Sequence, residues 1–250
     1  MSGIRYFFRG LGLISEPGIR GFVLFPVLIN LLIFSAVTWF LLGLTDDFTT
    51  WVTGALGDWV ESFLWLVWLV LGLLWLILYG YSFSIISNSI AAPFYGLLAE
   101  RVQAKVTGKA PDEPLNLRTF LAMVKRTMIR EWQKLLYILP RLLGLLVVSI
   151  PLSFIPVIGM VVPALWFIWS AWSLSLQNLD YAADNNLVTF PDMKTSMKKH
   201  RVYCLSFGSA VAIAAAIPVF NLLAIPAAVA GGTALWLEQW PDTAKTDLKP

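Results

Sequence analysis

The segment 15–21, Ser-Glu-Pro-Gly-Ile-Arg-Gly, has a composition that could bind an oxyanion. Its proline and glycines interrupt the chain, so free N–H groups and the positive end of a helix dipole follow the break. Arg20 adds a planar, permanently charged guanidinium that suits a tetrahedral oxyanion. The segment therefore predicts an anion site at Gly18, Ile19, Arg20 and Gly21. The alternative is a plain turn in which Arg20 binds a lipid phosphate.

No other pattern predicts catalysis, a metal ion or a bound cofactor. The one histidine, His200, has no serine or aspartate in a recognisable relation to it. With Cys204 it forms an i, i+4 pair that lacks the further ligands of a metal site. Cys204 is the one cysteine, which excludes an intramolecular disulfide, and it is expected to be a packed, inert thiol. The sequence also lacks a Walker A loop for ATP.

The composition indicates that water is not the main solvent of this chain. Apolar residues make up 58% of the 250 residues and charged residues 13%, roughly half of what the surface of a soluble domain requires. The mean hydropathy is +0.74. The net charge of +3 comes without the dense basic patch that binds nucleic acid, so no nucleic-acid partner is expected. We predict an all-α integral membrane protein in contact with membrane lipids.

Three membrane-associated segments are predicted in the first hundred residues. Residues 2–14 form an amphipathic helix, which we favour in the lipid headgroup plane, with packing on the protein as the alternative. Its pattern is Ile4, Phe7, Phe8 and Leu11 at helical spacing, away from Arg5 and Arg9. The apolar run 22–44 is too long for a cleavable signal and long enough to cross ~30 Å of hydrocarbon. Residues 63–99 predict a second, longer transmembrane helix.

Two later apolar blocks, 142–179 and 202–237, are each interrupted by a pair of prolines, which indicates a weak internal repeat. The pairs are Pro156 with Pro163 and Pro218 with Pro226. Each helical leg would have about 14 residues and measure about 21 Å, less than the ~30 Å hydrocarbon core. Each block is therefore predicted to be a re-entrant, hemi-penetrating helical hairpin that returns on the side it entered. Four tilted full spans are the alternative.

The charges between the apolar blocks predict the orientation. The 45–62 loop carries four acidic residues and no Lys or Arg, whereas 100–141 carries nine basic and four acidic residues. The positive-inside rule places 45–62 outside and puts 100–141 and the 238–250 tail in the cytoplasm. Within 100–141, a polar turn at 107–114 precedes a predicted helix at 116–140. Its basic stripe, Arg126, Arg130 and Lys134, is expected to be solvated or lipid-facing rather than to attract anions.

Short segments spread over nearly the whole chain resemble the CysZ family of bacterial inner-membrane sulfate permeases. They are Pro17–Arg20 with Pro26 and Asn30, Ile90–Phe94, Leu179–Tyr181, Phe207–Gly208, and Ile217–Pro218 with Asn221 and Pro226. The resemblance implies two long membrane helices plus hemi-penetrating hairpins in a multi-pass inner-membrane protein. It places the family's Gly-Leu-Arg sulfate motif on Gly18–Arg20. Some relatives have a second arginine where this chain has Gly21, which implies weaker affinity for a dianion; the Pro that often follows Asp180–Tyr181 is Ala182 here.

The resemblance implies sulfate uptake for assimilatory sulfate reduction and cysteine biosynthesis. Passage would follow a polar seam with Asn30, Ser84, Ser87 and Asn88 as candidates, although interhelical hydrogen bonding is the more ordinary role of each. Small residues at 208–232, the uncovered hairpin turns and the family resemblance together predict a homo-oligomer. Two other classes stay open: a channel or carrier for sulfite, thiosulfate or chloride, and a membrane scaffold or regulator that moves no anion.

Overall fold

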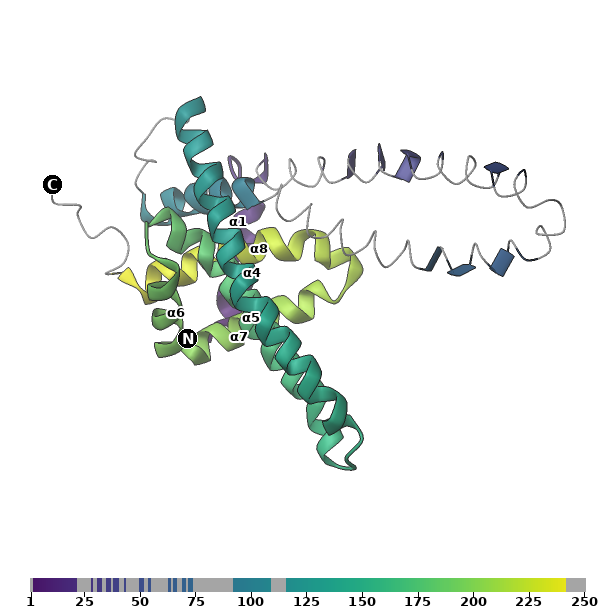
Figure 1. Cartoon of the computed structure of the whole chain (residues 1–250). Coiled ribbons are helices and arrows are strands. Elements are labelled where there is room, and N and C mark those ends of the chain that lie inside the picture. The colour runs from purple at the N-terminus through teal and green to yellow at the C-terminus, as the bar shows by residue number, and fades with distance from the viewer. Residues whose placement is uncertain are drawn as a thin grey trace. The chain divides into compact units, whose positions relative to one another are not determined.

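The computed structural model describes residues 2–21, 92–108 and 116–241, together with scattered residues between 28 and 73. Within these residues the protein is helical and contains no strand. The chain divides into two compact units, residues 25–91 and residues 1–24 with 92–250. The second unit contains α1 (Ile4–Ile14), α4 (Leu117–Ser153), η2 (Ile158–Val161), α5 (Val162–Asn185), α6 (Phe190–Lys199), α7 (Arg201–Ala215) and α8 (Pro218–Gln239). Figure 1 labels these six α-helices.

The predicted transmembrane helices at 22–44 and 63–99 lie largely outside the described residues. Every described residue between 28 and 73 is helical, and these include Thr50, Trp51 and Gly54 within the expected 45–62 loop. Residues 92–99 are also helical, and this helix continues to residue 107. The predicted end at 99 is therefore too early, because the first charged residue after an apolar run need not end a helix.

Helices α4 and α5 form a long hairpin. A capping box starts α4: the Asn116 side chain accepts the Thr119 N–H at 2.9 Å, and the Thr119 hydroxyl accepts the Asn116 N–H at 3.0 Å. With 37 and 24 residues, α4 and α5 measure about 55 and 36 Å. The predicted 14-residue legs are wrong for this hairpin. Both helices continue past the apolar block, and Leu121–Ser153 and Ile158–Asn185 are each long and apolar enough to cross a membrane.

The tip of the α4–α5 hairpin is apolar and tightly turned. Ile158 donates its N–H to the carbonyl of Pro156 at 2.8 Å, which closes a γ-turn centred on Val157 with φ 70° and ψ −48°. Pro163 lies in the first turn of α5, where its missing N–H costs no helical hydrogen bond. Phe154, Val157 and Met160 are about four-fifths exposed, so the tip requires an apolar environment.

Helices α7 and α8 form the second hairpin, with its turn at residues 216–217 (Figure 1). α7 has 15 residues and measures about 22 Å, close to the predicted leg, whereas α8 has 22 residues and measures about 33 Å. Pro218 begins α8, but Pro226 lies inside it. The two prolines that interrupt this block therefore do not both lie at its turn, and the repeat between the two hairpins is inexact.

Helix α1 packs on α8 and α7, and one of its faces is buried against them. A Cβ at Gly10 would overlap the carbonyl of Ala227, and a Cβ at Gly231 would overlap the carbonyl of Tyr6. Only glycine allows these two backbones to approach so closely. The alternative of packing on the protein therefore holds for this face, although Phe8 remains 63% exposed on another side of the helix.

The end of α8 is linked to α1 by polar contacts around Glu238. The Tyr6 hydroxyl donates to Glu238 Oε2 at 2.7 Å, and Arg9 pairs with Glu238 Oε1. Burial would raise the pKa of Glu238, but the hydrogen bonds from Tyr6 and Arg9 and the charge of Arg9 outweigh it, so the pKa lies below its ordinary value. The ionised carboxylate therefore strengthens the attachment of α1.

The small residues of α7 and α8 are used within this chain. Gly208 approaches the backbone of Ala171 on α5, and Gly232 approaches the backbone of Asn178. Leu176, Phe207 and Trp236 fill the core among α5, α7 and α8. The glycine and alanine face at 208–232 was expected to contact another copy. Its glycines Gly208, Gly231 and Gly232 instead contact neighbouring helices of the same chain, so they do not support that expectation.

Candidate anion-binding loop

The loop 15–21 directly follows α1 and is anchored by one apolar side chain. Ser15 and Glu16 donate their N–H groups to the carbonyls of Gly12 and Leu13, which ends the helix. Gly18 has a φ of 89°, in the left-handed region that favours glycine. Ile19 is buried, whereas Arg20 is exposed. The buried isoleucine thus fixes the loop while the guanidinium next to it stays accessible to a soluble anion.

The backbone supplies fewer free N–H groups than the sequence indicated. Ile19 and Arg20 donate their N–H groups to the carbonyl of Glu16 at 3.1 and 3.3 Å. The Gly18 N–H, which lies in the turn, donates to no backbone carbonyl among the described residues. Gly21 lies one residue into the helical stretch that begins at Arg20. The loop therefore offers the Gly18 N–H and the Arg20 side chain, and the other two amides stabilise the turn.

A second cation lies beside the loop. Lys105, from the helix 92–107, places its Nζ 3.0 Å from Glu16 Oε2. The two side chains are 58% and 36% exposed, so the pair contributes little to stability. The pair matters more for anion binding than for stability, because Glu16 is the one acidic residue of the loop and would repel an anion at Arg20. Lys105 compensates that charge, and sequence reasoning missed it because the two residues are far apart in the chain.

The basic stripe of α4 faces carboxylates on α5, so the expectation of a solvated or lipid-facing stripe is wrong. Arg130 Nη2 lies 2.7 Å from Asp180 Oδ1, and Arg126 Nε lies 3.0 Å from Asp184 Oδ2. Lys134 Nζ lies 3.5 Å from Asp180 Oδ2. Arg130, Lys134 and Asp180 are each at least nine-tenths buried. Burial of a charge requires a partner of opposite sign, and α5 supplies two.

This charge cluster is electrically balanced. Glu131 also pairs with Lys134, at 2.5 Å, so three basic side chains meet three acidic ones. A balanced cluster produces no net positive field that would attract a free anion. The matching spacings were visible in the sequence, since Asp180 and Asp184 are four residues apart, as are Arg126 and Arg130. What the sequence did not show is that the two helices are antiparallel neighbours in this register.

The remaining sequence candidates either pack against other residues of the protein or lie outside the described residues. Asn30, Ser84, Ser87 and Asn88 of the proposed seam belong to the undescribed part. His200 packs its ring against Trp240, with centroids 5.1 Å apart. Cys204 is fully buried, and its thiol contacts the Met197 carbonyl at 3.7 Å. His200 and Cys204 are thus both part of the packing between α7 and its neighbours.

The helices and their exposed apolar surfaces define an all-α membrane protein with an accessible arginine loop after its first helix. The sequence model of the family described as "Sulfate transporter CysZ/Etoposide-induced protein 2.4" matches residues 6–226. The chain belongs to this family, and the resemblance drawn from short segments is confirmed. The match includes most of α1, the whole 15–21 loop and both hairpins up to Pro226 of α8.

Proposed function

We propose that the protein imports sulfate across the bacterial inner membrane, for assimilatory sulfate reduction and cysteine biosynthesis. The observation that carries this proposal is the loop after α1, with exposed Arg20 beside a left-handed Gly18. The family description, which includes a sulfate transporter, supports the choice of anion. Transport would need no catalytic residue and no cofactor on this chain.

Binding at the loop would be modest and reversible, as transport requires. Arg20 can donate two parallel hydrogen bonds to a tetrahedral oxyanion, and the Gly18 N–H can add a third. One guanidinium and a compensated Glu16 leave the site only weakly positive. An anion held loosely at an exposed loop can leave toward a translocation path, for which we propose Asn30, Ser84, Ser87 and Asn88.

We propose that both hairpins are re-entrant. The support is the tip of the α4–α5 hairpin, where no charged residue lies between Ser153 and Pro163. A fully spanning hairpin would expose Phe154, Val157 and Met160 to water. Cysteine labelling at residues 156–163, in a Cys204→Ala background, tests this arrangement. Labelling from the periplasm as fast as in the 45–62 loop would rule it out.

We further propose that the protein is a homo-oligomer. The support is the apolar surface of α4, which the other described residues leave largely uncovered. Hairpins that end within the bilayer also need neighbours that cover their turns. Crosslinking and native mass measurement in mild detergent test the proposal. Detection of monomer alone under both conditions would contradict it.

Calorimetric titration of sulfate into the purified protein tests the binding site. Arg20→Ala should weaken binding about ten- to a hundred-fold, because a charged hydrogen bond contributes roughly 1.5–3 kcal/mol. Arg20→Lys keeps the charge but not the planar fork, so it should restore only part of the affinity. Gly18→Val should also weaken binding, because valine does not favour the φ of 89°. Arg5→Ala, an exposed arginine of α1, is the matched control.

Radiolabelled sulfate flux into proteoliposomes tests transport itself. Flux that depends on Arg20 supports sulfate import, and competition by sulfite, thiosulfate or chloride measures the selectivity. A larger flux of one of those anions would identify that anion, rather than sulfate, as the substrate. Sulfate binding without flux would instead favour a scaffold or regulator that senses the anion. Unchanged affinity in a folded Arg20→Ala protein would rule out the loop and leave Arg20 as a lipid anchor.

A further inference from the structure

A groove of about 750 Å³ lies between α4, α5, α6 and α7, apart from the 15–21 loop. Its volume falls within the range of ~300–1,000 Å³ that is usual for small-molecule sites. Three of the residues that line it are basic and none is acidic, while most of the others are apolar. The groove therefore combines an apolar channel with three basic side chains, none of which forms an ion pair with a carboxylate among the described residues.

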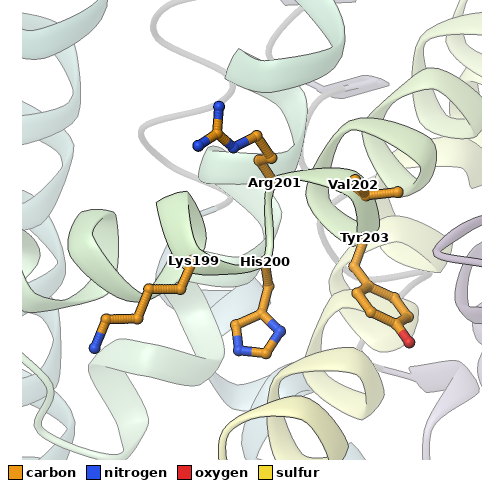
Figure 2. Close-up of a pocket in the computed structure, with 5 residues that line it drawn as sticks. All are labelled: Lys199, His200, Arg201, Val202 and Tyr203. Atoms are coloured by element: carbon orange, nitrogen blue, oxygen red, sulfur yellow. The ribbon is translucent and has the colours of Figure 1, made fainter.

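The three cations belong to one end of the groove, because Lys194 of α6 lies 4.9 Å from the ring of Tyr137, one turn before Arg141 on α4. Arg141 is the last charged residue of α4 before its apolar stretch, and Lys198 and Arg201 flank the junction of α6 and α7. Arg141 is fixed in place, because its Nη1 donates to the Tyr137 carbonyl at 2.8 Å and its guanidinium lies 3.9 Å from the centre of the Tyr137 ring. In Figure 2, Arg201 points away from His200 on the same junction.

The apolar part of the groove extends away from these cations. Along α4 it runs from Arg141 to Val148, and along antiparallel α5 from Trp172 to Leu165. Seven residues of helix correspond to about 10 Å on each wall. Gly144 lines the groove between them, and a Cβ there would meet no atom within 4 Å. The missing side chain therefore leaves room for a ligand beside α4.

We propose that this groove binds one anionic phospholipid. The phosphate would contact Arg141, Lys198 and Arg201, and an acyl chain would lie along α4 and α5. Charge complementarity favours an acidic lipid, because a zwitterionic headgroup would bring its own cation toward three others. A free inorganic anion would use the cations but would gain nothing from the apolar walls. The headgroup would thus anchor the hairpin at the membrane surface.

Lipid titration of the full-length protein in uncharged detergent, followed by native mass spectrometry, tests the proposal. Dioleoyl phosphatidylglycerol should bind more tightly than dioleoyl phosphatidylcholine, which has the same acyl chains. The double variant Lys198→Gln/Arg201→Gln should lower phosphatidylglycerol affinity about five-fold for each charge removed. Equal binding of the two lipids, or no effect of the double variant, would overturn the proposal.

A second variant tests the apolar part without a change of charge. Gly144→Leu fills the groove and should lower phosphatidylglycerol binding, whereas Gly12→Leu, at an equally open glycine of α1, should not. Unchanged lipid binding in Gly144→Leu would mean that the cations act as a headgroup site alone, and this would overturn the groove assignment. Displacement of the lipid by millimolar inorganic phosphate would likewise indicate a free-anion site. The comparison of Gly144→Leu with Gly12→Leu still tests the proposal if the double variant fails to fold.

Discussion

Arg130 of α4 and Asp180 of α5 form a buried ion pair across the first hairpin, with Nη2 and Oδ1 2.7 Å apart. The N–H does not point along this line, so the contact is an ion pair rather than an aligned hydrogen bond. Lys134 approaches the other carboxylate oxygen at 3.5 Å. Each of these charges depends on the others for its compensation, because solvent reaches almost none of them.

The removal of Asp180 should therefore destabilise the hairpin strongly. Asp180→Ala leaves Arg130 and Lys134 buried beside one fewer carboxylate, at an expected cost of roughly 3–5 kcal/mol. Arg126→Ala should cost much less, since that side chain is 39% exposed and can be solvated. Thermal unfolding in detergent measures both effects. The paired apolar replacement Arg130→Met/Asp180→Leu should recover most of the loss. A double variant as unstable as Asp180→Ala would contradict this account.

Glu16 and Lys105 should affect sulfate affinity in opposite directions. Lys105→Met exposes the Glu16 carboxylate to the bound anion and should weaken binding about two- to five-fold, the range of an exposed ion pair. Glu16→Gln removes the repulsion and should strengthen binding by a similar factor. The double variant should bind nearly as the unchanged protein does. Calorimetry at low and high salt checks this, because screening should shrink all three differences. A weaker Glu16→Gln protein would mean that the carboxylate instead holds the loop in shape.

The contact between α1 and α8 should not tolerate a side chain at Gly10. Gly10→Ala places a methyl group against the Ala227 carbonyl, so α1 must move away from α8. We expect faster proteolysis of the N-terminal region and a lower unfolding temperature. Gly12→Ala, where a Cβ meets no atom within 4 Å, should be neutral or stabilising by about 0.5–1 kcal/mol. Equal protease resistance of the two variants would show that the glycine contact is unimportant.

Acid should release α1 from the end of α8. The pKa of Glu238 is lower in the folded protein than its ordinary value of 4.5, so its stabilisation is present above that value. It is lost as the pH falls through the folded-state pKa, when protonation removes the charge that Arg9 pairs with. Protease resistance of the N-terminal region should therefore decrease below about pH 4.5. Glu238→Gln should lower the resistance at neutral pH and flatten the dependence. An unchanged acid profile in that variant would assign the effect to another group.

Much of the architecture follows from composition and chain breaks alone. The apolar excess, with so few charges, predicts a membrane protein because such a surface cannot be covered by water. Ile155–Pro156 and Ile217–Pro218 lie at the two hairpin turns, because proline starts a helix more readily than it continues one, although Pro140, Pro151 and Pro226 are tolerated inside helices. The loop at Gly18 is equally local, because a glycine beside a proline breaks α1 whatever its surroundings.

Only the tertiary structure decided which surfaces meet. The sequence shows that Arg126, Arg130 and Lys134 share a face of α4, but the partner of that face depends on the register of α5. In the same way, Gly231 of α8 approaches α1 and Gly232 approaches α5, and Lys105 reaches Glu16 from a distant helix. Helical periodicity is a local property of the backbone. Pairing between helices is set by long-range packing, and it determines whether a charged stripe faces solvent or a buried carboxylate.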